Sequence, residues 1–463
     1  MRAIAALLCA AALAQPPSRF QPGLKPFIAI DAPVIALTHV RVIDGTGAPP
    51  REDQTIVIDH GRIASVGGPA PAGAQVFDLS SHTVIPGLVG MHEHLFYPVG
   101  GGIPMYPEMA YSFPRLYLAA GVTTARTGGS VEPFTDLNVK RMIDDGRMPG
   151  PRLYVTGPYL EGKGSFAPQM HELTGPEDAA RLVEYWAAQG VTSFKAYMNI
   201  TRAELSAAVE AAHRHGIKVT GHLCSIGFRE AAAIGIDNLE HGLLVDTEFH
   251  PGKQPDVCPP NTRAEVARLD LNTAPVREMI ADLVRHNVAV TSTPAVFEAF
   301  DPDRPPLEQR FLDAVTTEAA SNYLAARARA ARGGAAAALK KELEFEYAFA
   351  KAGGLLIAGA DPTGNGGALA GFADQRNIEL LVEGGFTPVE AIRIATANGA
   401  SFLGELGRFG TIAPGKQADL VVISGNPAAR IGDIRNVKYV FKDGAAYDPS
   451  KLLESVRGQA GLR

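Results

Sequence analysis

The sequence predicts an α/β fold, a (β/α)8 TIM barrel joined to a small β-sandwich domain that both ends of the chain build. Three observations support this prediction. The middle of the 463-residue chain alternates short β-branched runs with alanine-rich, charged stretches, the pattern of a parallel sheet covered by helices. Both ends of the chain carry short β-rich runs without helices between them. Polar side chains lie at the ends of the central runs, where barrels of this kind gather their functional residues.

The first residues form a leader that is separate from the fold. Arg2 precedes the apolar run 3–14, which ends in the small-x-small pattern Ala12-Leu13-Ala14. The alternative, a short buried helix, is disfavoured because Gln15-Pro16-Pro17 follows without helical continuation. We therefore predict a signal peptide over residues 1–14 and export to a periplasm or to the medium.

The β-rich stretches at the two ends belong together. Runs such as Gln54–Asp59 near the start and Asp419–Ile423 near the end are short, β-branched and bounded by glycine or proline. Neither stretch alone has enough strands for a stable sheet with a buried face. We therefore expect one β-sandwich domain, assembled from residues 30–86 and 406–450, with the barrel inserted between its two parts.

The barrel is predicted over residues 87–405. Its first four candidate strands start 30 to 40 residues apart, which fits one strand–helix unit each. The segment is longer than the roughly 250 residues typical of this barrel, and we expect the surplus at 243–287 and 296–350. The eight candidate strands are Leu88–His94, Val122–Gly128, Arg152–Gly157, Thr192–Tyr197, Ile217–His222, Asn238–His241, Val288–Pro294 and Leu355–Asp361.

Polar residues stand at the ends of five of these strands. Because alternate residues of a strand share a face, His92 and His94 both point inward and Glu93 points out. Any one of these histidines alone is readily explained as a core residue whose hydrogen bonds are satisfied. Burial of all these polar groups without partners, however, would cost several kcal/mol. Imidazole and carboxylate groups suit divalent metals such as zinc. The predicted ligands are His92, His94, Lys195, His222, His241 and Asp361.

Composition excludes several classes of protein. The chain has 46% hydrophobic and 20% charged residues and a net charge of −6, so disorder is excluded and no basic stripe is present for nucleic acid. It has no run of about 18 apolar residues, so we expect no membrane span. Its three cysteines are too few for a disulfide framework, and Cys224 is predicted to be a small buried filler. A small-molecule substrate remains as the expected partner, and formation of a homo-oligomer stays open.

Several motifs together resemble the amidohydrolase superfamily, and most closely its branch of imidazolonepropionases and Xaa-Pro dipeptidase-like enzymes. The resemblance covers about residues 34 to 445. The motifs are Thr83–His94, Ile58–Gly67, Gly410–Val421, Asn238–Gly242 and Ala358–Asp361.

This resemblance implies two divalent metal ions, with zinc as the expected metal. The segment around Lys195 resembles the part of hydantoinases that carries a carboxylated lysine, so Lys195 would bridge the two ions. His92, His94 and Asp361 would hold one ion, and His222 and His241 the other. The implied reaction is hydrolysis of a C–N bond by a metal-bridging hydroxide, with Asp361 as the catalytic acid and base. Deamination is disfavoured because Ser225 replaces the glutamate of single-metal deaminases.

Several residues near the strand ends are candidates for contact with the substrate. Tyr197 would donate a hydrogen bond to a substrate oxygen, unless it is a packed aromatic side chain. Arg126 or Lys163 would pair with a free carboxylate, unless Arg126 is a structural ion-pair partner. His171, in the loop after the third strand, would meet the substrate or be solvated. Tyr97 and its neighbours after the first strand offer aromatic surface for an apolar group.

The branch and the expected export favour N-acyl-amino acids or Xaa-Pro dipeptides as substrates. Two alternatives remain open at this point. The same metal pair would serve a lactonase or a phosphoesterase, because fold and metals do not fix the substrate. A secreted binding protein that has lost catalysis is the alternative of another class.

Overall fold

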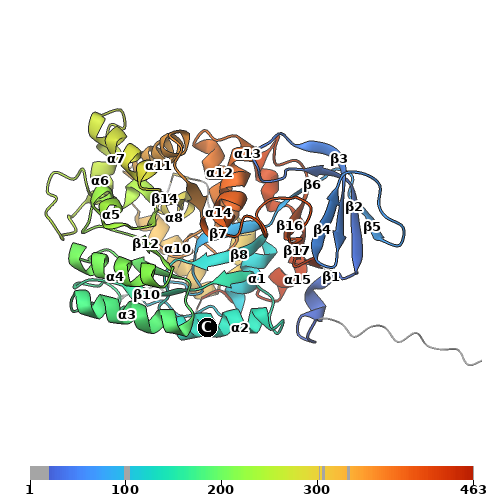
Figure 1. Cartoon of the computed structure of the whole chain (residues 1–463), viewed down its shortest axis with the longest axis horizontal. Coiled ribbons are helices and arrows are strands. Elements are labelled where there is room, and N and C mark those ends of the chain that lie inside the picture. The colour runs from blue at the N-terminus through green and yellow to red at the C-terminus, as the bar shows by residue number, and fades with distance from the viewer. Residues whose placement is uncertain (1–19, 99–104, 302, 305–307, 331–333, 462–463) are drawn as a thin grey trace, which may run out of the picture.

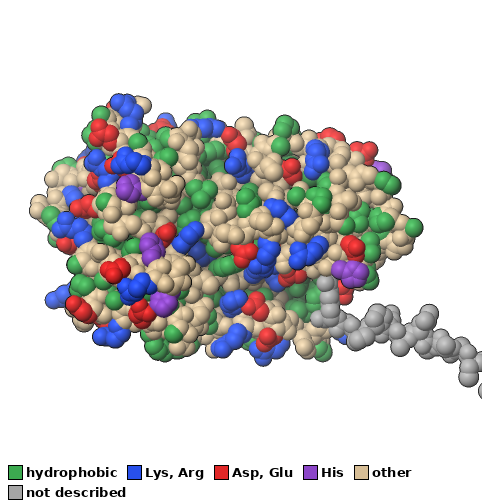
Figure 2. Space-filling view, viewed as in Figure 1, with side chains coloured by type: hydrophobic (Ala, Val, Ile, Leu, Met, Phe, Trp, Pro, Cys, Tyr) green, Lys and Arg blue, Asp and Glu red, His purple; other side chains and the backbone are tan. Residues whose placement is uncertain are grey.

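The computed structural model describes residues 20–98, 105–301, 303–304, 308–330 and 334–461. Figure 1 shows a β-rich part, built from the blue and red ends of the chain, beside a larger part in which helices surround parallel strands. The predicted signal peptide lies outside the described residues. In the part of the chain that is described, no helix has the length and apolarity needed to cross a membrane. Basic and acidic side chains are interspersed over the face seen in Figure 2, without a basic stripe on that face.

The two chain ends build one nine-stranded sheet, in which β6 pairs antiparallel with β16 and so joins the ends. Its hydrogen-bonded order is β1-β18-β17-β16-β6-β2-β3-β4, with β5 beside β2. Alternate residues such as Ile35 and Leu37 are fully buried in its core. The strands are β1 (Ile28–Ile30), β2 (Val34–Val42), β3 (Arg51–Asp59), β4 (Arg62–Val66), β5 (Gln75–Asp78), β6 (His82–Pro86), β16 (Leu420–Ser424), β17 (Val437–Lys442) and β18 (Ala445–Tyr447).

The larger part contains parallel strands in two sheets, β7-β8-β9 and β10-β11-β12-β13-β14-β15. The third predicted strand is divided into β9 and β10 at Val155. The Asp361 N–H donates to His92 O at 2.8 Å, which links the end of β15 to the end of β7. The strands are β7 (Leu88–Glu93), β8 (Val122–Thr127), β9 (Arg152–Tyr154), β10 (Thr156–Leu160), β11 (Ser193–Ala196), β12 (Lys218–Gly221), β13 (Asn238–Glu240), β14 (Ala289–Ser292) and β15 (Leu356–Ala358).

Helices between these strands bury an apolar stripe against the sheets. In α7, Val276, Met279, Ile280 and Leu283 are buried at helical spacing. The helices are α1 (Ser112–Ala119), α2 (Pro133–Asp144), α3 (Pro176–Gln189), α4 (Arg202–Arg214), α5 (Phe228–Ile234), α7 (Ala274–Arg285), α12 (Phe372–Glu383), α13 (Pro388–Arg393), α14 (Gly399–Phe402) and the C-terminal α15 (Pro449–Glu454). The fold is therefore a mixed α/β fold with parallel sheets.

Additional helices occupy the two segments in which the sequence predicted surplus chain. They are α6 (Thr262–Arg268), α8 (Pro294–Glu298), α9 (Gln309–Ala314), α10 (Thr317–Arg329) and α11 (Gly334–Lys351). A disulfide between Cys224 and Cys258 ties the first of these segments to the chain that follows β12. Cys224 is buried, as predicted, but its bond to Cys258 shows that it is not merely a filler.

Candidate metal centre

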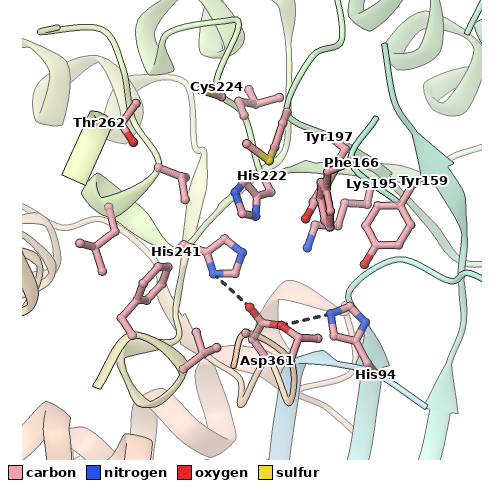
Figure 3. Close-up of a pocket in the computed structure, with 18 of the residues that line it drawn as sticks. His94, Tyr159, Phe166, Lys195, Tyr197, His222, Cys224, His241, Thr262 and Asp361 are labelled. Carbon is pink, nitrogen blue, oxygen red and sulfur yellow. Dashed lines mark hydrogen bonds and ion pairs between the residues drawn. The ribbon is translucent and has the colours of Figure 1, made fainter. Parts of the chain in front are cut away.

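A cavity of about 380 Å³ lies where the parallel strands end. Figure 3 shows His94, Lys195, His222, His241 and Asp361 directed toward the same space. Each of these residues lies within three residues of a strand's carboxyl end. Such ends meet at one edge of a parallel arrangement, so residues far apart in the sequence converge there.

His92, His94 and Asp361 form a compact set of ligand atoms, all within 4.8 Å of one another. Asp361 Oδ1 lies 3.3 Å from His94 Nε2 and 3.7 Å from His92 Nε2. The close approach of the two chain segments depends on Gly359, because a Cβ atom there would lie 2.3 Å from the backbone nitrogen of His92. Imidazole and carboxylate donors at this spacing suit a divalent metal.

The three remaining predicted ligands adjoin this set. Lys195 Nζ lies 2.9 Å from His92 Nε2. The His241 ring lies 4.6 Å from the His92 ring and 4.5 Å from the His222 ring, between centroids. The structure therefore brings all six predicted ligand residues into one cluster.

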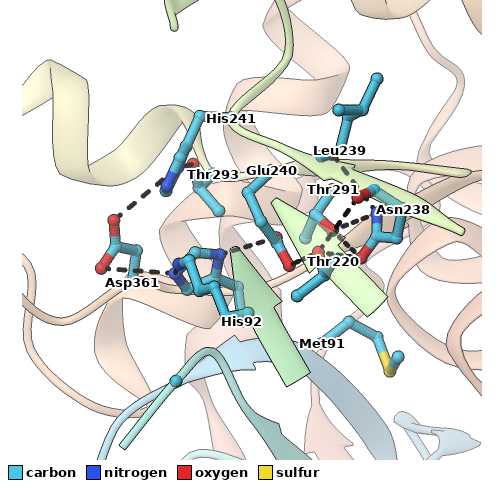
Figure 4. Close-up of polar contacts among 12 residues, drawn as sticks. Met91, His92, Thr220, Asn238, Leu239, Glu240, His241, Thr291, Thr293 and Asp361 are labelled. Carbon is cyan, nitrogen blue, oxygen red and sulfur yellow. Dashed lines mark hydrogen bonds and ion pairs between the residues drawn. The ribbon is translucent and has the colours of Figure 1, made fainter. Parts of the chain in front are cut away.

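Hydrogen bonds on the far side of the rings fix three of the imidazoles, of which Figure 4 shows His92 and His241. His92 Nδ1 contacts Glu240 Oε2 at 2.7 Å, and His241 Nδ1 contacts Thr293 Oγ1 at 2.7 Å. His94 Nδ1 lies 3.2 Å from Gly129 O. Among the described residues, the buried Nε2 of His241 has no hydrogen-bond partner. A metal ligand needs this arrangement, in which one nitrogen is held by the protein and the other is left for the ion.

Two of the candidate ligands have left-handed backbone conformations, His241 with φ 65° and Asp361 with φ 46°. For a residue other than glycine this conformation costs on the order of 1–3 kcal/mol, and it persists where the surrounding contacts enforce it. Such positions cluster at functional sites.

The electrostatics of the cluster favour the ligand forms of its side chains. Burial lowers the pKa of His94 to about 4 and of His222 to about 3, so both imidazoles are neutral at neutral pH. Burial acts to raise the pKa of Asp361, but His92 and the other imidazoles outweigh it and hold that pKa well below its usual range. Burial also lowers the pKa of Lys195 to about 8, which brings its neutral amine within reach of ordinary pH. These residues fit a divalent metal.

Arg126 is not on the wall of the cavity, which corrects its predicted role in substrate binding. Its side chain is buried and donates to Glu240 Oε1 at 2.7 Å and to Met91 O at 2.8 Å. Glu240 in turn holds His92. Arg126 therefore acts behind the metal ligands and is a structural ion-pair partner.

Two other substrate predictions are corrected. His171 Nε2 pairs with Asp178 Oδ2 at 3.0 Å, and His171 is absent from the residues that line the cavity. Tyr97 is buried and donates a hydrogen bond to Gly366 O, so it offers no surface to a substrate. Tyr197 does line the cavity, packed edge-on against Tyr159 at 4.8 Å.

Most of the apolar and cationic side chains that line the cavity were not predicted from the sequence. Phe96, Tyr159, Phe166, Phe297 and Arg263 line the cavity together with Cys224. Phe96 was within reach of prediction, because strand alternation continues from His92 and His94 to Phe96. Phe297 and Arg263 lie in the two surplus segments, where no strand pattern indicates direction.

The fold and the cluster define a mixed α/β protein with a candidate divalent-metal centre at its strand ends. A model of the amidohydrolase family matches residues 83–446, so the chain belongs to that family. This result confirms the superfamily that the motifs predicted. It indicates a hydrolase that acts on carbon–nitrogen bonds.

Solved structures agree with this assignment in fold. A candidate prolidase from Bifidobacterium longum is 25% identical over 91% of this chain and 98% of its own, with a TM-score of 0.67. A Xaa-Pro dipeptidase with methionine bound in its active site is 22% identical over 90% and 100%, with a TM-score of 0.68. Bottromycin amidohydrolase is 22% identical over 96% and 95%, also with a TM-score of 0.68. No curated protein matches the sequence.

Proposed function

We propose that this protein is a metal-dependent amidohydrolase that cleaves the C–N bond of small substrates, such as N-acyl-amino acids or Xaa-Pro dipeptides. The observation that carries the proposal is the convergence of six ligand-type side chains on one cavity of about 380 Å³. A cavity of this size suits a small molecule. The names of the similar structures, a candidate prolidase and a Xaa-Pro dipeptidase, support the substrate class.

In this proposal the parallel strands close into a (β/α)8 barrel, and the nine-stranded sheet folds over as a β-sandwich. The chain passes from β9 to β10 through Val155 alone, and the hydrogen bond from the Asp361 N–H to His92 O joins the opposite edges. Both features support a closed arrangement.

The proposed ligands form two sets. His92, His94 and Asp361 would hold one divalent ion, with zinc as the proposed metal, and His222 and His241 would hold the second. Lys195 would be their shared ligand if its neutral amine added CO2 and released one proton to give a carbamate. The two ions supply Lewis-acid polarisation of the scissile carbonyl and lower the pKa of water toward neutrality.

The residues of the chain orient the substrate and move the proton. Asp361 is ionised because its pKa is held low, so its carboxylate accepts the proton of the attacking water. The same carboxyl group then delivers that proton to the leaving nitrogen. Phe297 and Phe166 cover the cavity with apolar surface, which limits access of bulk water.

We also propose that the protein is exported. The predicted leader at residues 1–14 supports this, and so does the Cys224–Cys258 disulfide, because disulfides persist mainly in oxidising compartments.

A rate screen tests the proposed function. The metal-loaded protein is assayed against N-acyl-amino acids, Xaa-Pro dipeptides, lactones and phosphotriesters, before and after removal of metal by a chelator. We expect cleavage of at least one amide, lost with the metal and restored by zinc. Cleavage of a lactone or phosphotriester with no amide cleaved would contradict the substrate class. Protein that retains no metal and cleaves nothing would favour the binding protein.

A further inference from the structure

The wall of the cavity includes one arginine that the proposed reaction does not use. Arg263 lies on α6, within the segment between β13 and α7, and lines the cavity beside Thr262, which Figure 3 labels. Of the described residues that line the cavity, Lys195 and Arg263 are those with an amine or guanidinium group. Lys195 contacts His92 and belongs to the metal cluster. Arg263 is therefore the cationic side chain on the cavity wall that is available to bind part of a ligand.

The guanidinium of Arg263 lies over two aromatic rings. Its Cζ lies 4.8 Å from the ring centroid of Phe300 and 5.3 Å from that of Phe297, and both phenylalanines line the cavity. A cation–π contact of this kind does not use the N–H donors of the guanidinium, so they remain available to a ligand.

Within the described part of the chain, no carboxylate pairs with Arg263 and no hydrogen bond from its side chain is present. The arginine five residues further along α6 behaves differently, since Arg268 pairs with Glu265 at 2.8 Å. Arg126, behind the metal ligands, pairs with Glu240. An unpaired arginine facing a cavity is ready to accept an anionic group from outside the chain.

The position of Arg263 suits the far end of a short substrate. The rings of His241 and Phe297 lie 5.6 Å apart, and Phe297 in turn contacts the Arg263 guanidinium. The distance from the Arg263 guanidinium to the His241 ring is therefore at most the sum of these two distances. One amino-acid residue spans about 3.5 Å, so a substrate whose scissile carbonyl lies at the metal ligands would bring the carboxylate one residue away toward this cation.

The disulfide anchors the segment that carries Arg263. Cys258 lies five residues before Arg263, and its partner Cys224 lies two residues after His222 and also lines the cavity. The covalent link therefore fixes the base of α6 to the strand end that supplies a metal ligand. This reduces the entropy lost when a substrate is held between the two.

We propose that Arg263 binds the free carboxylate of the substrate and so selects amides of amino acids over neutral amides. The proposal rests on the proposed hydrolytic function for its substrate but assigns a residue and a charge requirement that the metal centre does not provide. The guanidinium would bind the carboxylate through two parallel N–H···O hydrogen bonds.

The kinetic test compares the best-cleaved N-acyl-amino acid or dipeptide with the same compound carrying a C-terminal primary amide. We expect Arg263→Gln to raise KM for the acid roughly 10- to 100-fold with kcat changed less than about threefold. The amide should change less than about threefold in both constants, and Arg263→Lys should recover part of the loss. Arg268→Gln, on the same helix but outside this cavity, is the matched control and should leave both substrates unchanged.

A binding test separates this inference from the proposed function. Isothermal titration with N-acetyl-L-leucine and its primary amide requires no turnover. If no amide is cleaved but Arg263→Gln still weakens binding of the acid selectively, the hydrolytic function fails and the role of Arg263 stands. If the wild type does not prefer the acid, or if the variant binds acid and amide with equal losses, the carboxylate role of Arg263 is overturned.

Discussion

Replacement of Arg126 distinguishes a residue that binds substrate from one that supports the metal ligands. Arg126 and Glu240 are both buried, with relative exposures of 1% and 0%, and their side chains are 2.7 Å apart. Arg126→Met keeps an unbranched side chain but removes the guanidinium, so the Glu240 carboxylate is left without its cation. Removal of one partner of a buried ion pair costs about 3–5 kcal/mol. We expect a loss of this size in the free energy of unfolding, measured by urea denaturation of the metal-loaded protein.

The same replacement should weaken metal binding. Glu240 Oε2 holds His92 Nδ1 at 2.7 Å, and burial acts against its charge while His92 and Arg126 keep its pKa well below the usual range. Loss of a group that orients a ligand in this way typically lowers metal affinity by roughly 10- to 100-fold. Competition with a chelator measures this change.

A double variant provides the control. Arg126→Met with Glu240→Gln has no uncompensated buried charge, so it should unfold at a higher urea concentration than Arg126→Met alone. The reasoning would be refuted if Arg126→Met bound metal as tightly as the wild type and raised KM only for substrates with a free carboxylate. That result would indicate that Arg126 binds the substrate carboxylate, as the sequence first suggested.

Four further outcomes follow from the site. Asp361→Asn should retain the fold, by circular dichroism, and lose about 10²- to 10⁴-fold in kcat, because its carboxyl group moves the proton; activity within a few-fold of the wild type would contradict that role. Lys195→Ala should reduce the metal content of the purified protein from two ions to one or none, and added short carboxylates should restore part of the activity, whereas two tightly held ions would argue against a bridging lysine. Burial lowers the pKa of Lys195 to about 8, so the neutral fraction of its amine should rise about tenfold per pH unit below that value and level off above it. The rate at which metal-free protein is reconstituted with metal at fixed CO2 concentration should follow the same curve. A rate independent of pH would exclude carboxylation of a titrating amine. Cys258→Ser should destabilise the protein by about 3–4 kcal/mol, because the disulfide closes a loop with a sequence separation of 34; an unchanged urea midpoint would show that this segment is held by packing alone.

The strand ends were predictable because their pattern is local. A β-branched run places its last residues at a definite edge of the sheet, and alternation decides which of them face inward. His92, His94, His222 and His241 therefore came together as the sequence indicated. The division of the third strand at Val155 was not visible, because Arg152–Gly157 has no interruption in its pattern.

The corrected residues depend on partners that are distant in the sequence. The guanidinium of Arg126 finds Glu240, 114 residues later, and no local pattern connects the two. The pairing of Cys224 with Cys258 depends on how the segment after β13 folds back, which a count of cysteines does not reveal. Arg263 lies in that same segment, so neither its exposure to the cavity nor its lack of a partner was predictable.

Glu93 shows how the strand that supplies two ligands also positions a third. The sequence predicted that Glu93 points out, and it does face away from the metal cluster, but it is fully buried. Burial, followed by the neighbouring Asp374, raises its pKa well above the usual range. Its Oε1 accepts a hydrogen bond from the Ala360 N–H at 3.0 Å, while the Asp361 N–H donates to His92 O at 2.8 Å.

These two contacts hold the peptide groups on both sides of Ala360. They offset the cost of the left-handed conformation of Asp361, on the order of 1–3 kcal/mol, because each buried N–H is satisfied only in that arrangement. The carboxylate of Asp361 is thus directed at His94 by the same strand that carries His94. Consecutive residues at the end of β7 therefore have complementary functions: His92 and His94 face the candidate metal centre, and Glu93 between them fixes the loop that brings Asp361 to it.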